Sequence, residues 1–230
     1  MQERRHEISR LEAFSDAAFA FALTLLVVSL DVPRSYDDLI RTVRGIPSFA
    51  CCFALLVWIW NEHNLFFRRY GLQDGLTTFL NTGLLFVVLF YVYPLKFMFD
   101  SMFARIARDP GLQQMSLPQL ANASAIYGAG FVVLFVMFAL LYRHAYRKRE
   151  SLGLTPLEIF DNRMFAGHHL VSASVGLAVV AVARFAPVEM SPIAPTMFAL
   201  MGPAHGIYGA AAGKRRRAMQ KQAETAAPVA

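Results

Sequence analysis

Charged residues are scarce in this sequence. Only 17% of the 230 residues are Asp, Glu, Lys or Arg, whereas 56% are hydrophobic, and the mean hydropathy is +0.42. Soluble domains carry about 25% charged residues, because their surfaces face water. The shortage excludes an ordinary soluble enzyme and predicts a protein that lies in a lipid bilayer.

Cysteine and the common catalytic motifs are also missing or nearly so. The two cysteines, Cys51 and Cys52, are adjacent in one apolar run, which implies packing residues and no disulfide or zinc framework. Four histidines, His63, His168, His169 and His205, raise the alternative of an intramembrane metal or haem enzyme, but no H-E-x-x-H spacing occurs. We therefore predict no enzymatic activity and no cofactor, with the histidines forming hydrogen bonds near the cytoplasmic interface.

Apolar residues are abundant and fall into six runs of helix length. A bilayer core about 30 Å thick needs roughly 20 apolar helical residues for each crossing. The runs cover residues 11–30, 46–67, 75–95, 119–142, 164–183 and 190–213. We predict an all-α membrane protein with a single six-helix domain, residues 1–213, and a basic, then disordered, tail at 214–230.

The distribution of Lys and Arg predicts the orientation of these spans. Cytoplasmic loops retain positive charge, and with the N-terminus inside, the inner segments hold 15 of the 22 Lys and Arg residues. Both ends are then cytoplasmic. The basic clusters lie beside apolar runs, where anionic lipid headgroups attract them, so the net charge of +6 indicates no nucleic-acid partner. A single six-helix unit favours a prokaryotic plasma membrane.

Ionisable residues inside the first span require partners, because each costs roughly 2.5 to 3.5 kcal/mol at the centre of a membrane helix. Arg10 and Asp16 lie about 240° apart around the helix, so they do not pair with each other. The second span returns to the same depth near its end. We predict a polar cluster of Arg10, Ser15 and Asp16 with Asn61 and His63; the alternative is that these residues extend separately to the headgroups.

A stripe of residues at spacings of three and four follows along the first span. The stripe consists of Ala17, Phe21, Thr24, Val28 and Asp31, with Leu25 at its border. It carries one hydroxyl and ends in a carboxylate at the predicted outer surface. By itself this pattern is weak, because a Thr in a membrane helix often hydrogen-bonds its own backbone.

The first two spans resemble a known family. The string Arg10-x-x-x-Phe14-Ser15-Asp16, with Thr24 eight residues after the Asp, is similar to the signature of the transmembrane protein 175 family of potassium channels. The run from Trp60 to Phe66 resembles the end of that family's second helix. The remaining spans match in number, length and topology.

The resemblance implies a homotetramer in which four copies of the first helix surround a pore for potassium and other monovalent cations. It implies a constriction at Phe21, where the family usually has Ile or Leu, and a contribution to selectivity from Thr24, with Leu25 or Val28 one turn further out. Asp31 would supply a negative outer mouth. The sequence contains no T-V-G-Y-G loop, which excludes a carbonyl-ring filter.

A secondary transporter is the main alternative function. Polar residues within a six-helix bundle could bind a solute during alternating access, and such proteins often contain broken helices near the midplane. The one irregularity of this kind in the sequence is Pro203. Because further irregularities and repeated halves are missing from the sequence, a channel is favoured over a transporter.

Overall fold

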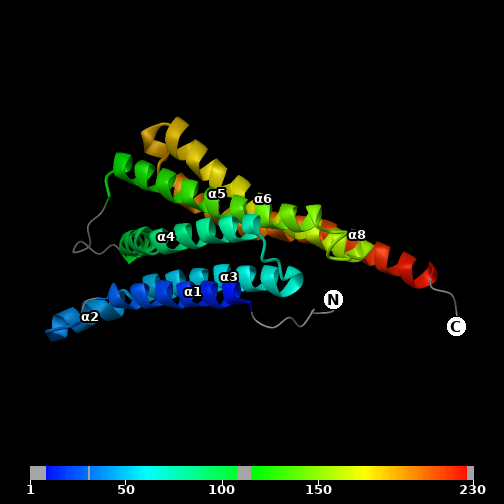
Figure 1. Ribbon diagram of the computed structural model, residues 1–230. Coiled ribbons are helices and arrows are strands. Elements are labelled where there is room, and N and C mark those ends of the chain that lie inside the picture. Colours follow the sequence, from blue (N-terminus) through cyan, green and yellow to red (C-terminus); the bar gives the residue numbers. More distant parts are fainter. Residues whose placement is uncertain (1–8, 31, 108–114, 227–230) are drawn as a thin grey trace.

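Helices make up the described part of the chain. The computed structural model describes residues 9–30, 32–107 and 115–226. Its elements are α1 (Arg10–Val28), α2 (Tyr36–Arg44), α3 (Ile46–Tyr70), α4 (Gly75–Ala107), α5 (Leu117–Arg147), α6 (Pro156–Phe185), the 3₁₀ turn η1 (Val188–Met190), α7 (Ile193–Thr196), η2 (Met197–Leu200) and α8 (Met201–Ala226). These residues contain no strand, so the predicted all-α class is confirmed (Figure 1).

Local sequence signals determine where several helices begin and end. Ser9 caps α1 and Thr155 caps α6, each in a reciprocal capping box with a glutamate three residues later, Glu12 and Glu158. These boxes satisfy backbone N–H groups of the first turn that have no partner within the helix. α3 ends at Gly71, whose φ of 56° lies in the left-handed region that favours glycine.

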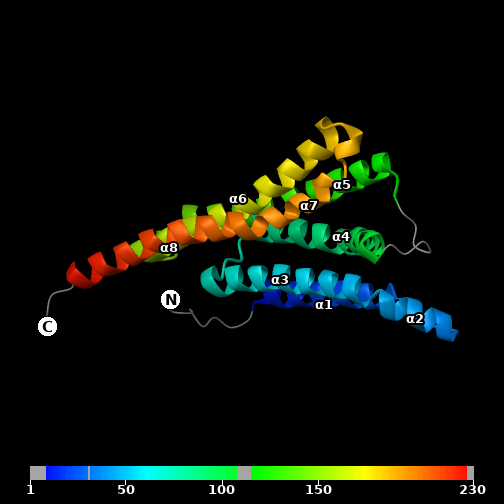
Figure 2. The same ribbon diagram turned by 180° about the vertical axis from the view of Figure 1, so that it is seen from behind.

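The long helices pack in succession (Figures 1 and 2). α1 lies against α3 and α4, α4 contacts α5, α5 packs along α6, and α6 contacts α8. α5 and α6 approach closely at Gly128 and Gly176, because a Cβ added at Gly128 would lie 3.0 Å from the Gly176 carbonyl oxygen. Buried aromatic side chains such as Phe66, Phe135 and Tyr142 fill the space between α3, α5 and α6.

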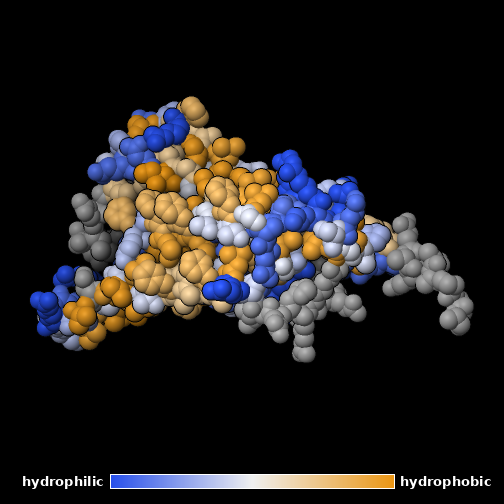
Figure 3. All heavy atoms as spheres, viewed as in Figure 1, coloured by the Kyte–Doolittle hydropathy of each residue, from blue (hydrophilic) through white to orange (hydrophobic). Residues whose placement is uncertain are grey.

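Five helices in the described part of the chain are long and apolar enough to cross a membrane. They are α1, α3, the part of α4 from Gly75 to Phe103, α5 and α6. On the face drawn in Figure 3, apolar residues gather along the helices while hydrophilic residues concentrate toward the ends of the molecule. A protein with this distribution spans the membrane several times.

The predicted sixth span differs from the structure. Residues 190–213 form the last residue of η1, then α7, η2 and the start of α8, because closely spaced prolines such as Pro195 remove backbone donors and interrupt a long helix. Of the tail predicted as basic and then disordered, 214–230, the residues up to Ala226 belong to α8, and 227–230 lie outside the described residues. There Arg216 donates two hydrogen bonds, 2.8 and 3.0 Å long, to the buried Asp161 of α6, which gives the basic segment a fixed partner.

Other helices extend beyond their predicted spans. α4 continues past the predicted end at Leu95, and α6 begins at Pro156, well before the predicted start at Met164. Hydropathy marks only the apolar part of a helix, whereas backbone hydrogen bonds continue into polar sequence. The predicted boundaries therefore describe the apolar cores of these helices.

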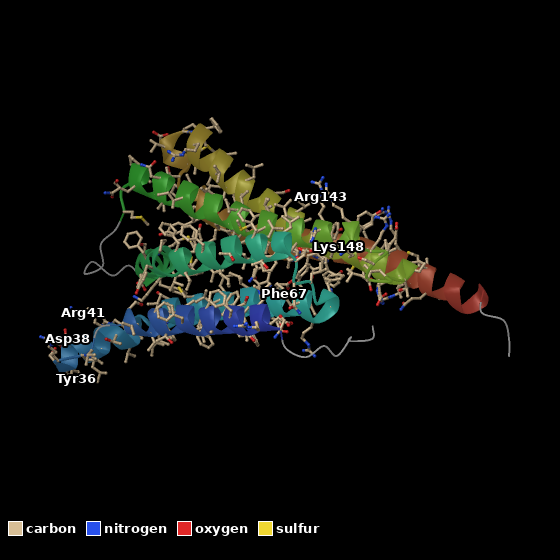
Figure 4. The ribbon with its side chains drawn as sticks, viewed as in Figure 1. Tyr36, Asp38, Arg41, Phe67, Arg143 and Lys148 are labelled. Atoms are coloured by element: carbon tan, nitrogen blue, oxygen red, sulfur yellow. The ribbon has the colours of Figure 1, made fainter. Side chains whose placement is uncertain are left out.

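The short helix α2 was not predicted. It begins at Ser35, whose hydroxyl accepts a hydrogen bond from the Asp38 N–H, and it has apolar residues from Tyr36 to Val43 on one side. Figure 4 shows Tyr36, Asp38 and Arg41 on this helix, which extends from the end of the bundle where α1 finishes. At nine residues it is too short to register as a membrane span.

Candidate functional site

Two faces of α1 have opposite environments. Ser15, Phe19, Ala22 and Leu26 are buried against the rest of the chain. The other face carries the predicted stripe: Phe21 is 56% exposed, Val28 is 70% exposed, and Ala17 and Thr24 are also exposed. Leu25 is half-buried at the border, and Asp31 lies outside the described residues. The stripe is therefore available to another chain, to water or to lipid.

The Thr24 hydroxyl already has a hydrogen-bond acceptor. It donates to the Ala20 carbonyl of the preceding turn at 2.9 Å, as a Thr in a membrane helix commonly does. A hydroxyl oxygen has two acceptor lone pairs that such a bond leaves available. Thr24 can thus present an oxygen on the exposed face without leaving its proton unpaired.

A buried hydrogen-bonded chain connects α1, α4 and α3. His63 lies 2.7 Å, Nε2 to Oδ1, from Asn81, whose Nδ2 donates to the Ser15 hydroxyl at 2.9 Å. Ser15 in turn donates to the Leu11 carbonyl at 2.8 Å. With Asn81 accepting through Oδ1, the proton of the His63 ring is on Nε2. At most 1% of each of Ser15, Asn81 and His63 is exposed. The polar atoms of these three side chains therefore depend on one another and on nearby backbone for hydrogen bonds.

The predicted polar cluster is therefore divided. Ser15 and His63 are joined through Asn81, which the prediction had omitted, and the exposed Asp16 accepts a 2.8 Å hydrogen bond from the Trp60 indole. Arg10 and Asn61 are both exposed and take part in neither group.

The motif residue Phe14 is also 62% exposed. Neighbouring positions on a helix point about 100° apart, which is why Trp60 reaches α1 and Asn61 does not. The available signal for Asn81 was that it is the one amide side chain in the uncharged run 75–95, whose other polar groups are Thr and Tyr hydroxyls.

Asp74 connects the α3–α4 loop to the end of α5. Its carboxylate forms an ion pair with Lys148, accepts from His144 Nε2 at 2.8 Å, and accepts from the Thr77 N–H at 2.9 Å. Lys148 lies beside this loop in Figure 4. Burial alone would raise the pKa of Asp74, but the hydrogen bonds from Lys148, Thr77 and His144 outweigh it and hold the pKa below its usual range.

We expect Asp74→Asn to lower the melting temperature of the purified protein by about 2–4 °C at pH 7, as about 1 kcal/mol does for a chain of this size. A lowered pKa in the folded state stabilises the protein above the unfolded value of 3.8. The difference from wild type should therefore be constant down to about pH 4 and shrink at lower pH. Asp37→Asn, on the exposed face of α2, is the control; equal melting curves for all three proteins would contradict the assignment.

The adjacent histidines of α6 face different neighbours. His168 lies with its ring parallel to that of His205 on α8, with 2.8 Å between the two Nδ1 atoms, and His205 Nε2 lies 2.9 Å from the Ser172 hydroxyl. His169 is buried and packs on Phe138. Within the described residues, no three His, Cys, Asp or Glu side chains converge as a metal site.

A cavity of about 600 Å³ lies between α3, α4, α5 and the segment from Pro192 to Met201. Its walls are almost entirely apolar, with Leu56, Val88, Phe131 and Phe198 among them. The exposed stripe of α1 takes no part in it. A passage formed between several copies of α1 would not exist as a cavity within one chain.

Long apolar helices joined by buried polar contacts define a multi-pass helical membrane protein. The sequence model of the endosomal/lysosomal potassium channel TMEM175 matches residues 10–91, which span α1, α2, α3 and half of α4. A potassium channel of Marivirga tractuosa is 39% identical over 192 residues, covering 80% of this chain and 78% of that protein. A potassium channel of Chamaesiphon minutus is 28% identical over 149 residues, covering 60% and 66%.

Solved structures agree with this relationship. The crystal structure of a variant of the potassium channel MtTMEM175, in complex with a nanobody–MBP fusion protein, has a TM-score of 0.81 and 33% identity, covering 93% of this chain and 97% of that one. A TMEM175 homologue from Chamaesiphon minutus shares the fold, with a TM-score of 0.57 and 23% identity over 86% and 96% of the two chains. The chain belongs to the TMEM175 family of potassium channels, whose matched members are channels and not enzymes. The resemblance found in the sequence is confirmed.

Proposed function

We propose that this protein is a potassium-permeable cation channel in which four copies of α1 surround a central pore. The observation that carries the proposal is the exposed stripe of α1, which contrasts with the buried opposite face of the same helix. The relatives named as potassium channels support the permeant ion. Residues of the chain would thus line a passage that exists only in the assembly.

Polar groups on and beside the stripe favour water over lipid as its environment. Thr24 lies within the stripe and the exposed Asp16 lies at its inner border. Charged and polar side chains in membrane helices face a protein interior or a water-filled cavity, because exposure to hydrocarbon is costly. Phe21 would form the constriction, and Leu25 and Val28 would lie further outward.

A ring of Phe21 side chains would act as a hydrophobic gate. A narrow apolar passage expels water, and an ion cannot lose its hydration there without replacement ligands. Opening must widen the ring, after which the Thr24 oxygens can face the hydrated ion. Asp31 would concentrate cations at the outer mouth. The sequence has no carbonyl-ring filter motif, so selectivity would arise at these side chains.

The proposed topology has six crossings with both ends in the cytoplasm of a prokaryotic plasma membrane. Its support is the position of α8, which lies along α6 and finishes toward the end of the bundle where α1 starts (Figure 1). The excess of Lys and Arg in the segments at that end favours the cytoplasmic side. The sixth crossing would combine α7, η2 and the first half of α8.

Ion flux into proteoliposomes tests the channel against the secondary transporter. We expect potassium uptake that rises with concentration without saturating at low values, exceeds sodium uptake, and needs no co-transported ion. Saturating flux coupled to a second solute would favour the transporter. Native mass determination should give four chains per particle, and monomers alone would contradict the pore between copies.

A further inference from the structure

Four polar side chains from three helices converge within the membrane-spanning bundle. Glu62 and Arg69 lie two turns apart on α3, Tyr142 lies on α5, and His169 lies on α6. We call this group the buried polar site. It is separate from the chain of Ser15, Asn81 and His63, since Glu62 and His63 are neighbours on α3 that point in different directions.

Pairwise distances link these groups into one cluster. His169 Nε2 lies 3.8 Å from the Glu62 carboxylate, and the His169 and Tyr142 rings are 5.2 Å apart. The Arg69 guanidinium lies 3.8 Å above the ring of Phe165, which itself packs on Tyr142. Arg69 is close to the Tyr142 hydroxyl but makes no well-directed hydrogen bond to it.

Three polar atoms of the site are buried without a hydrogen-bond partner. They are Arg69 Nη1, the Tyr142 hydroxyl and His169 Nε2. Tyr142 is fully buried and His169 is 3% exposed. A buried polar atom that lost its hydration and gained no bond is costly, so several such atoms in one cluster indicate a missing partner.

We propose that the buried polar site binds internal water. A water molecule is neutral and both donates and accepts, so it can accept from Arg69 and Tyr142 and donate to Glu62 or His169. The Arg69 charge opposes a cation in this place, and the Glu62 carboxylate opposes an anion. Water is thus the ligand whose chemistry matches all four side chains.

The bound water would fix α3 against α5 and α6. α3 also holds α1, directly through Trp60 to Asp16 and indirectly through His63, Asn81 of α4 and Ser15. The water site therefore connects α5 and α6, through α3, to α1, the helix that carries the exposed stripe. Only this last consequence rests on the proposed pore; the water site itself does not.

Thermal melting of Tyr142→Phe in the full-length protein tests the site. If water bridges the hydroxyl, its removal should lower the melting temperature by about 2–4 °C, as loss of one satisfied hydrogen bond does. If the site is dry, removing an unpaired hydroxyl should leave the melting temperature unchanged or raise it, which would overturn the proposal. Tyr70→Phe is the reference for a satisfied hydroxyl, because Tyr70 accepts from Asn162 at 2.9 Å.

X-ray radiolytic footprinting of the wild-type protein provides a test that needs no variant. Bound water generates hydroxyl radicals that label the side chains beside it. We expect labelling of Tyr142 but none of Phe66, which is equally inaccessible to bulk solvent and packs against the Tyr142 ring. An unlabelled Tyr142 would overturn the water site and leave the proposed channel function unaffected, because this readout does not measure flux.

Discussion

Replacing Phe21 by alanine is expected to raise potassium flux through the reconstituted protein by on the order of tenfold or more. Each ~1.4 kcal/mol removed from the permeation barrier is a factor of ten in rate. In the proposed tetramer, four phenyl rings at one level would leave little room for hydrated ions, whereas four methyl groups would widen the passage and let water remain in it. The change is measured as potassium uptake into proteoliposomes at equal protein content.

Phe86→Ala is the matched control for this variant. Phe86 lies on α4 and is 69% exposed, so the same atoms are removed from an exposed position on a different helix. Flux through this variant should equal that of wild type. If Phe21→Ala and Phe86→Ala gave the same flux as wild type, Phe21 would not line the passage, and the stripe would have to face lipid or another helix.

The second large effect concerns assembly of the folded protein. Asn81→Ala should destabilise it by ~3 kcal/mol, because the His63 ring and the Ser15 hydroxyl would both lose a partner in a buried environment. A loss of that size is a large fraction of the 5–15 kcal/mol by which proteins are typically stable. We expect a melting temperature lower by on the order of 10 °C and a reduced yield of intact protein.

Asn61→Ala is the control, since Asn61 is exposed on the neighbouring helix. It should change the melting temperature little. If Asn81→Ala were as stable as wild type, the hydrogen bonds among Ser15, Asn81 and His63 would make no net contribution to the free energy of unfolding. Larger destabilisation by Asn61→Ala than by Asn81→Ala would instead support the polar cluster predicted from the sequence, which contains Asn61 and omits Asn81.

Much of the fold could be read from local sequence. The apolar runs identify α1, α3, α4, α5 and α6 because a bilayer requires long uncharged helices. Capping pairs such as Ser9 with Glu12 mark helix starts through contacts three residues apart. The region after Phe185 could not be read in this way, because its prolines break an apolar run whose length alone suggested a single helix.

The candidate site could be predicted only in part. The R-x-x-x-F-S-D string identified the first helix and Ser15, and the polar residues near the end of the second span suggested His63. Asn81 lies 66 residues from Ser15 in the sequence and could not be assigned, because its role depends on how α4 packs against α1 and α3. Glu62 and His169 likewise meet only after α3 and α6 are brought together.

Sequence by itself determined the membrane environment, the helical class, the family and the stripe on α1, because hydropathy, helical period and a short motif are properties of neighbouring residues. Tertiary structure decided which face of α1 is buried, which polar groups satisfy one another, and that the basic tail continues as a helix held by Asp161. These outcomes depend on contacts between segments far apart in the chain. The sequence pattern of one segment does not specify which other segment will pack against it.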